Sequence, residues 1–173
     1  MRRECVNHRR QEIGAIVKKI AIFVDVQNIY YTTRQAYGRQ FNYRELWQRI
    51  SCQGEIVSAI AYAIDRNNDK QLNFQHALKH IGFTVKLKPF IQRSDGSAKG
   101  DWDVGITIDI LETVKNVDTV VLLSGDGDFD LLLEKIRNDY NVSAEVYAVP
   151  ALTANSLIES ASVFHCIEED LLL

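Results

Sequence analysis

Short runs of apolar residues alternate with longer amphipathic segments along most of this chain. Six apolar runs predict β-strands, the last of them a short edge strand: 20–24, 55–64, 83–88, 119–123, 143–149 and 164–167. Between them, apolar residues at helical spacing predict helices at about 43–52, 70–81, 103–114, 129–138 and 154–161. Continuous apolar strands that alternate with helices are typical of parallel sheets covered on both faces. The pattern therefore predicts an α/β fold, a three-layer sandwich around a mainly parallel, Rossmann-like sheet of about five or six strands.

Length and composition predict one domain. The chain has 173 residues, 46% of them hydrophobic, which is enough for one substantial core. No internal repeat or low-complexity linker divides it, so we expect a single domain over 19–173. Residues 1–18, which are rich in arginine, are expected to be an N-terminal extension. The clearest loop is 90–99, because turn-forming residues are concentrated at its centre.

The lengths of the apolar runs and the spacing of the cysteines indicate the cellular compartment in which we expect this protein. The longest apolar runs fall well short of the roughly 20 residues of a membrane span, and the basic N-terminus leads into no signal-like region. Cys5, Cys52 and Cys166 lack any paired spacing, which argues against disulfides and against a zinc knuckle. We expect a soluble, cytoplasmic protein without a membrane partner or a disulfide-linked partner. A homo-oligomer is compatible with the sequence.

The net charge of −3 conceals an asymmetry between the two parts of the chain. Residues 1–100 contain 17 Lys and Arg against eight Asp and Glu, whereas 101–173 contain three against 15. Such a division is compatible with a positive face that attracts polyanions beside an acidic centre that holds metal. Ordinary solvated charge is the alternative explanation.

An acidic glycine turn follows the apolar run 119–123. The segment 124–130 reads SGDGDFD, with carboxylates at alternate positions between a predicted strand and a predicted helix. Like charges at such short range raise one another's pKa, so a cation or a helix N-terminus is expected to neutralise them. Asp126, between two glycines that allow close approach and positive φ, is the better candidate ligand. Asp128 is either a ligand or the N-cap of the following helix.

Two other segments supply acids at similar junctions. Asp25 ends the first predicted strand, where it is either part of a site or the cap of the helix that follows, and Asn28 is placed to orient it or a phosphate. Near the start of the helix at 103–114, Asp101 suits the N-cap position, and Asp103 lies in a register that turns it toward the sheet edge. Asp109 falls on another face, where we expect it to be solvated or in a local hydrogen bond.

The carboxyl ends of parallel strands meet at one edge of a sheet, where open α/β proteins bind their ligands. We therefore expect Asp25, Asp103, Asp126 and Asp128 to converge. Their oxygens are hard ligands suited to Mg²⁺ or Mn²⁺. Such a cation activates water and offsets charge on a phosphodiester, so no cysteine or histidine nucleophile is needed.

These segments in this order resemble the NYN domain family, the LabA-like branch of the PIN-like nuclease superfamily. The resemblance covers about 19–167 and is carried by 23–28 (FVDVQN), by Lys99-Gly100 followed by Asp103-Val104, and by 124–129 (SGDGDF). It implies a PIN-like sheet, a divalent metal and RNA as the substrate. It also implies an acidic core of Asp25, Asp103 and Asp126, with Asp128 as a further ligand or water-orienting residue and with Asn28 and Ser124 as contacts to the site. Because two residues rather than one separate Lys99-Gly100 from Asp103-Val104, Asp101 remains an alternative to Asp103.

Other enzyme classes fit the sequence less well. An aspartyl phosphatase needs a second acid two residues after the first, but position 27 is Gln27, and no GxGxxG follows the first strand. A receiver domain needs a set of paired acids that is missing here. His76 and His80 lack the glutamate of a zinc-hydrolase helix, since Ala77 follows His76.

The sequence therefore predicts a metal-dependent ribonuclease, with an endonuclease favoured if the site is open. The alternative is an RNA-binding or regulatory protein whose acidic pocket binds metal with little or no catalysis. In either case Lys99 and Arg93, with Lys86 and Lys88 nearby, are candidates for binding phosphates. The aromatic residues Trp102, Phe90 and Tyr30 either stack on bases or only pack.

Overall fold

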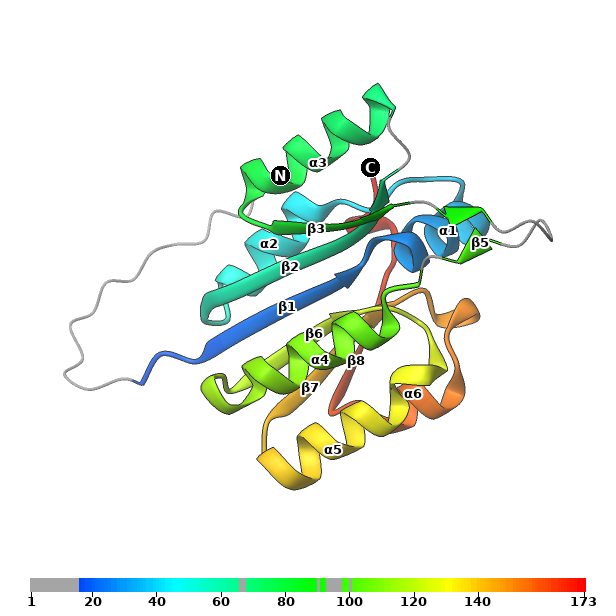
Figure 1. Ribbon diagram of the computed structural model, residues 1–173. Helices are drawn as coiled ribbons and strands as arrows, with labels where there is room; N and C mark the ends of the chain where they lie inside the picture. The colour runs from blue at the N-terminus through cyan, green and yellow to red at the C-terminus, as the bar shows by residue number, and fades with distance from the viewer. Residues whose placement is uncertain (1–15, 66–67, 90, 93–97, 100) are drawn as a thin grey trace.

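Six parallel strands form the central sheet of a computed structural model that describes residues 16–65, 68–89, 91–92, 98–99 and 101–173 (Figure 1). The strands are β1 (Lys19–Asp25), β2 (Glu55–Asp65), β3 (Thr84–Pro89), β6 (Thr119–Leu123), β7 (Ser143–Ala148) and β8 (Val163–Cys166). Their order across the sheet is β3-β2-β1-β6-β7-β8. The predicted α/β sandwich around a parallel sheet is confirmed, including the short edge strand β8.

Helices cover both faces of this sheet (Figure 1). On one face lie α1 (Val26–Tyr37), α2 (Tyr43–Ser51) and α3 (Asp69–Ile81), and on the other lie α4 (Asp103–Thr113), α5 (Asp130–Tyr140) and α6 (Asn155–Ser160). Four short 3₁₀ helices span Val114–Asn116, Gly127–Phe129, Pro150–Leu152 and Glu169–Leu171. In β1, Ile22 and Val24 enter the first core while Ala21 and Phe23 enter the second, which is why the strand is apolar at consecutive positions.

Strands β1 and β6 mark the point where the chain changes direction across the sheet. From β1 the chain adds β2 and then β3 on one side, and it returns to β6 before adding β7 and β8 on the other. Val24 pairs with Leu123, so Asp25 and Ser124 leave the two strands at the same level. In parallel α/β sheets such a switch point is the usual place for a ligand.

Two elements differ from the sequence predictions. Helix α1 was not among the predicted helices, because its buried side contains only Val26, Ile29 and Thr33 and gives a weak apolar periodicity. The predicted loop at 90–99 contains β4 (Ile91–Gln92) and β5 (Ala98–Lys99), which pair antiparallel. Arg93, Phe90 and most of the predicted N-terminal extension lie outside the described residues.

Neither Cys52 nor Cys166 forms a disulfide, and Cys5 lies outside the described residues. Within the described part of the chain, no helix combines the length and the hydrophobicity that crossing a bilayer would require.

Two buried threonines offer a test of the packing around the sheet. Thr119, the first residue of β6, is 1% exposed, and its hydroxyl has no hydrogen-bond partner among the described residues. Thr33 in α1 is equally buried, but its hydroxyl donates to the Ile29 carbonyl oxygen at 2.8 Å. We expect Thr119→Val to raise the free energy of unfolding by about 1 kcal/mol, because it removes a buried polar group that lacks a partner.

The isosteric Thr33→Val is the matched control and should lower the free energy of unfolding by about 1 kcal/mol, since it removes a made hydrogen bond. Urea unfolding at an unchanged m-value measures both differences. A loss of stability in Thr119→Val as large as that in Thr33→Val would show that the Thr119 hydroxyl is hydrogen-bonded in solution.

Candidate metal centre

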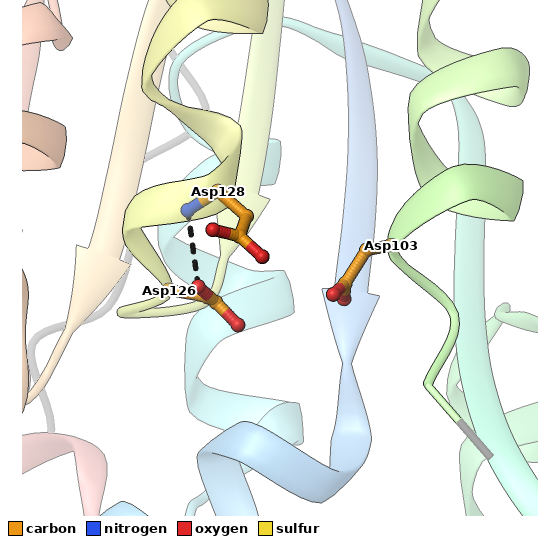
Figure 2. A group of neighbouring side chains, drawn as sticks. All are labelled: Asp103, Asp126 and Asp128. Atoms are coloured by element: carbon orange, nitrogen blue, oxygen red, sulfur yellow. Dashed lines mark hydrogen bonds between the residues drawn. The ribbon is translucent and has the colours of Figure 1, made fainter. Parts of the chain in front are cut away.

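Three carboxylates meet at the carboxyl edge of the sheet. One oxygen from each of Asp103, Asp126 and Asp128 lies within 4.8 Å of the others. Figure 2 shows Asp103 reaching from the start of α4 toward Asp126 and Asp128, which come from the turn after β6. Asp103 and Asp126 are half-buried and Asp128 is exposed. We call these three residues the acidic group.

Asp25 lies beside the acidic group and is joined to it through Ser124. The Ser124 hydroxyl donates a hydrogen bond to Asp25 Oδ2 at 3.4 Å. It also accepts one from the Asp126 backbone N–H at 3.2 Å. Ser124 is completely buried. Its side chain therefore holds Asp25 and the acidic turn in a fixed relation, and it has no surface with which to contact a substrate.

Asn28 ties α1 to the same turn. Its side-chain Oδ1 accepts a hydrogen bond from the Gly125 N–H at 3.0 Å, and its own backbone N–H donates to Asp25 Oδ1 at 3.1 Å. Asp25 is thus also the N-cap of α1, which is one of the two roles expected of it. Of the two other expected substrate contacts, Arg93 lies outside the described residues, and Lys99 belongs to β5, where only its backbone is described.

The caps around the acidic group differ from those expected. Asp126, not Asp128, caps the 3₁₀ helix Gly127–Phe129, because its Oδ1 accepts the Asp128 N–H at 3.0 Å. Asp101 does not cap α4, whose N-cap position is Trp102 without a side-chain hydrogen bond. Asp128 is therefore left with its carboxylate free of a capping role.

The glycines of the turn allow it to pack closely against another segment of the protein. Neither Gly125 nor Gly127 is among the residues with positive φ, contrary to expectation. A Cβ on Gly125 would lie 2.9 Å from Thr153 Oγ1, and one on Gly127 would lie 2.9 Å from the Ala154 Cβ. The close approach is thus to the segment before α6, whose Ala154 N–H donates to the Gly125 carbonyl at 3.1 Å.

Burial and mutual repulsion disfavour charge on these carboxyls. Burial, followed by the charges of Asp126 and Asp25 and smaller contributions from Asp101 and Asp128, raises the pKa of Asp103 to about 6. Burial also raises the pKa of Asp25, against the opposing hydrogen bonds from the Asn28 N–H and the Ser124 hydroxyl. No lysine, arginine or histidine among the described residues forms an ion pair with any of the four acids. The electrostatics favour a bound cation.

The start of α4, which positions Asp103, is fixed by contacts that the sequence analysis did not identify. Trp102 Nε1 donates to the Ala63 carbonyl of β2 at 2.9 Å, and Lys88 Nζ lies 4.4 Å from the centroid of the Trp102 ring. A Cβ on Gly105 would lie 2.7 Å from the same ring, so the indole packs directly on the helix backbone. Trp102 is thus part of the support of the site, and its ring is not open for a base to stack on.

Asp109 is a half-buried anchor that bonds across the fold, rather than the solvated or locally bonded residue that was expected. It accepts hydrogen bonds from the Tyr62 hydroxyl at 2.6 Å and from Lys86 Nζ at 2.7 Å. Both partners come from neighbouring strands, β2 and β3. Sequence position gave no signal for this network, because the three residues are far apart in the chain. Lys86 is engaged in it, so its charge is paired with Asp109.

A family model, a relative and a solved structure resemble this chain over most of its length. The model of the NYN domain matches residues 19–168. Low amplitude and bright protein LabA from Synechococcus elongatus is 35% identical over 127 residues, which are 69% of this chain and 68% of that protein. The crystal structure of a protein of unknown function from Vibrio parahaemolyticus is 53% identical, with a TM-score of 0.88 over 94% of this chain and 100% of that one.

The raised pKa of Asp103 predicts an unusual dependence of stability on pH. A helix N-terminus favours negative charge, yet the folded pKa of about 6 lies above the ordinary 3.8, so burial and repulsion outweigh the helix dipole. The folded state then binds more protons than the unfolded state between about pH 4 and 6, and this group lowers stability as the pH rises through that window. We expect Asp103→Asn, measured with chelator present, to be more stable than the parent at pH 7 and to lose that advantage by pH 4.

Glu159→Gln is the control, because it also removes one negative charge but from the exposed surface of α6. It should leave the pH dependence of the free energy of unfolding unchanged. If the parent and Asp103→Asn show parallel stability profiles from pH 4 to 7, the carboxyl of Asp103 is not under electrostatic strain.

Proposed function

Because the chain belongs to the NYN domain family, we propose that it is a divalent-metal-dependent ribonuclease whose cation is held by the acidic group, with Asp25 beside it. The observation that carries this proposal is the meeting of the three carboxylates at the switch point of the sheet, with no cationic side chain paired to them among the described residues. A folded protein gains stability from such a cluster only if something positive occupies it.

The chemistry of the donors fits Mg²⁺ or Mn²⁺. All members of the acidic group are aspartates, which offer hard oxygen ligands, and no cysteine or histidine belongs to it. When bound, such a cation would supply Lewis-acid chemistry, offsetting charge on a phosphodiester and lowering the pKa of a water molecule.

The chain's own residues prepare this site before any ligand arrives. Buried Ser124 holds Asp25 and the backbone of Asp126 together, and Asn28 fixes the turn through Gly125. Donors held by such supporting hydrogen bonds need little rearrangement on binding. Asp128, as the exposed member of the group, is the carboxylate nearest to an approaching substrate or water.

Membership of the NYN family favours RNA as the substrate. The negative charge of the site adds the requirement that a cation be present when the RNA binds. A phosphodiester approaching Asp25 and the acidic group meets several negative charges. Without a cation between them this approach is repulsive, so binding of the scissile phosphate and binding of the metal are expected to be coupled.

A protein that binds RNA and metal without cutting remains the second candidate. It would use the same acidic group. The distinction lies in turnover, which the following experiment measures.

We expect the protein to cleave single-stranded or stem-loop RNA in Mn²⁺ or Mg²⁺, and Asp126→Asn to lower the rate by about 100-fold or more. A metal worth several kcal/mol to the transition state accounts for a factor of that size. The asparagine oxygen still accepts the Asp128 N–H, so the change removes the charge while keeping the turn. Gel analysis of end-labelled RNA measures the rate and shows whether cutting is internal.

Glu159→Gln should cleave at the parental rate, because Glu159 is an exposed acid on α6 with no place in the acidic group. In parallel, Mn²⁺ should raise the melting temperature of the parent and of Glu159→Gln, but far less that of Asp126→Asn. Cleavage that survives both chelation and Asp126→Asn would refute the metal mechanism. RNA binding and a metal-induced rise in melting temperature without any cleavage would favour the second candidate.

A further inference from the structure

Helix α1 has an exposed face that combines aromatic, amide and basic side chains. Four exposed residues at positions i, i+3, i+4 and i+7 form it: Gln27, Tyr30, Tyr31 and Arg34. This spacing puts them on one side of the helix, next to the side that buries Val26, Ile29 and Thr33. We call these four residues the α1 face.

The two tyrosine rings of the α1 face are exposed to solvent. Tyr30 is 46% exposed and Tyr31 is 49% exposed, with their centroids 5.3 Å apart in an edge arrangement. The Arg34 guanidinium lies 5.4 Å from the centroid of Tyr30. Arg34 has no carboxylate partner among the described residues, whereas Lys86 and Arg49 each form an ion pair. The face therefore offers planar stacking groups and an unneutralised positive charge.

The α1 face begins two residues after Asp25 and leads away from the carboxyl end of β1. Gln27 follows Asp25 by two residues, and Asn28, which lies on the same side of the helix as Tyr31, bonds to Gly125 of the acidic turn. At a rise of 1.5 Å per residue, Tyr30 lies about 7.5 Å and Arg34 about 13.5 Å along the helix from Asp25. Figure 1 shows α1 directly beyond the carboxyl end of β1, at the edge of the sheet where the carboxylates meet.

We propose that the α1 face holds unpaired nucleotides of the RNA next to the scissile phosphate, an assignment that rests on the proposed function. Bases stack on tyrosine rings and on the plane of an arginine guanidinium, and the guanidinium also attracts a phosphate. Arg34 over Tyr30 extends the stacking surface outward from the helix. Such contacts tolerate any base, so the face gives affinity and direction of the strand rather than sequence preference.

Two alternatives fit the α1 face less well. The π-face of a base in a duplex is covered by its neighbours, so paired RNA cannot use exposed tyrosine rings in this way. A protein partner would also use tyrosine and arginine, but the centre of such an interface is mostly apolar. None of the exposed large aliphatic side chains lies on α1; they are found elsewhere, for example at Val104 and Ile108 of α4.

The test measures RNA binding separately from cutting. In an Asp126→Asn background that prevents cleavage, fluorescence anisotropy with a labelled single-stranded RNA of mixed sequence gives the affinity. We expect Tyr30→Ala to weaken binding by about 5- to 150-fold, which corresponds to the loss of one base stack. Tyr30→Phe keeps the ring and should stay within about twofold, and Arg34→Ala should weaken binding by about fivefold or more.

Lys135→Ala is the matched control for Arg34→Ala. Lys135 also lies over a tyrosine of its own helix, 5.9 Å from the Tyr140 ring, but on α5 rather than beside Asp25. It should leave RNA affinity within about twofold. The duplex of the same sequence should bind more weakly than the single strand, with no dependence on Tyr30.

The remaining outcomes distinguish a failure of the α1-face proposal from a failure of the nuclease proposal. Unchanged affinity in Tyr30→Ala and Arg34→Ala, while the parent still cleaves RNA, overturns the role of the α1 face and leaves the nuclease proposal intact. Binding that depends on Tyr30 in a protein that never cleaves retains the α1 face and overturns the nuclease. Duplex RNA bound as tightly as the single strand overturns the assignment to unpaired nucleotides. A changed oligomeric state on gel filtration, with RNA affinity unchanged, identifies a protein interface instead and also overturns it.

Discussion

The parallel pairing of β1 with β6 is the constraint on which the rest of the structure depends. These two strands are buried on both faces, and their register sets Asp25 and Ser124 at one level. The carboxylates of the site lie at this same level. The acidic turn continues β6, and α4 packs against β1 and brings Asp103 to the same edge. A slip of the register would separate Ser124 from Asp25 and remove the hydrogen bond that couples strand to turn.

The elements predicted best from the sequence were those whose burial is visible as a local pattern. The run at 119–123 is apolar at four of its five positions, and β6 spans those residues. Asp103, Asp126 and Asp128 were also identified as candidates from local order, since each follows a turn or begins a helix. What local order could not supply was the partner of each polar group. Asp109 meets Tyr62 and Lys86 only because folding brings this residue of α4 next to β2 and β3, and the glycines of the acidic turn are explained by Thr153 and Ala154, more than 20 residues further along the chain.

The acidic group also shows a conflict between stability and chemistry. Burial and repulsion raise the pKa of Asp103, so the charged form of this carboxyl is less stable in the folded protein than in water. Burial raises the pKa of Asp25 as well, and the hydrogen bonds from Ser124 and the Asn28 N–H only partly offset that penalty. Sites of this kind, where local electrostatics oppose folding, are characteristic of functional centres.

The charge asymmetry of the sequence takes on a different meaning in the folded protein. Lys18, Lys86 and Arg49 from the basic part of the chain pair with Glu145, Asp109 and Asp170 from the acidic part. Part of the asymmetry is thus neutralised by ion pairs across the sheet and between helix and C-terminal segment. Attraction for a polyanion must then come from cations that remain unpaired close to the site. Arg34 meets both conditions, whereas Lys86 near α4 does not, because its charge already serves to hold Asp109.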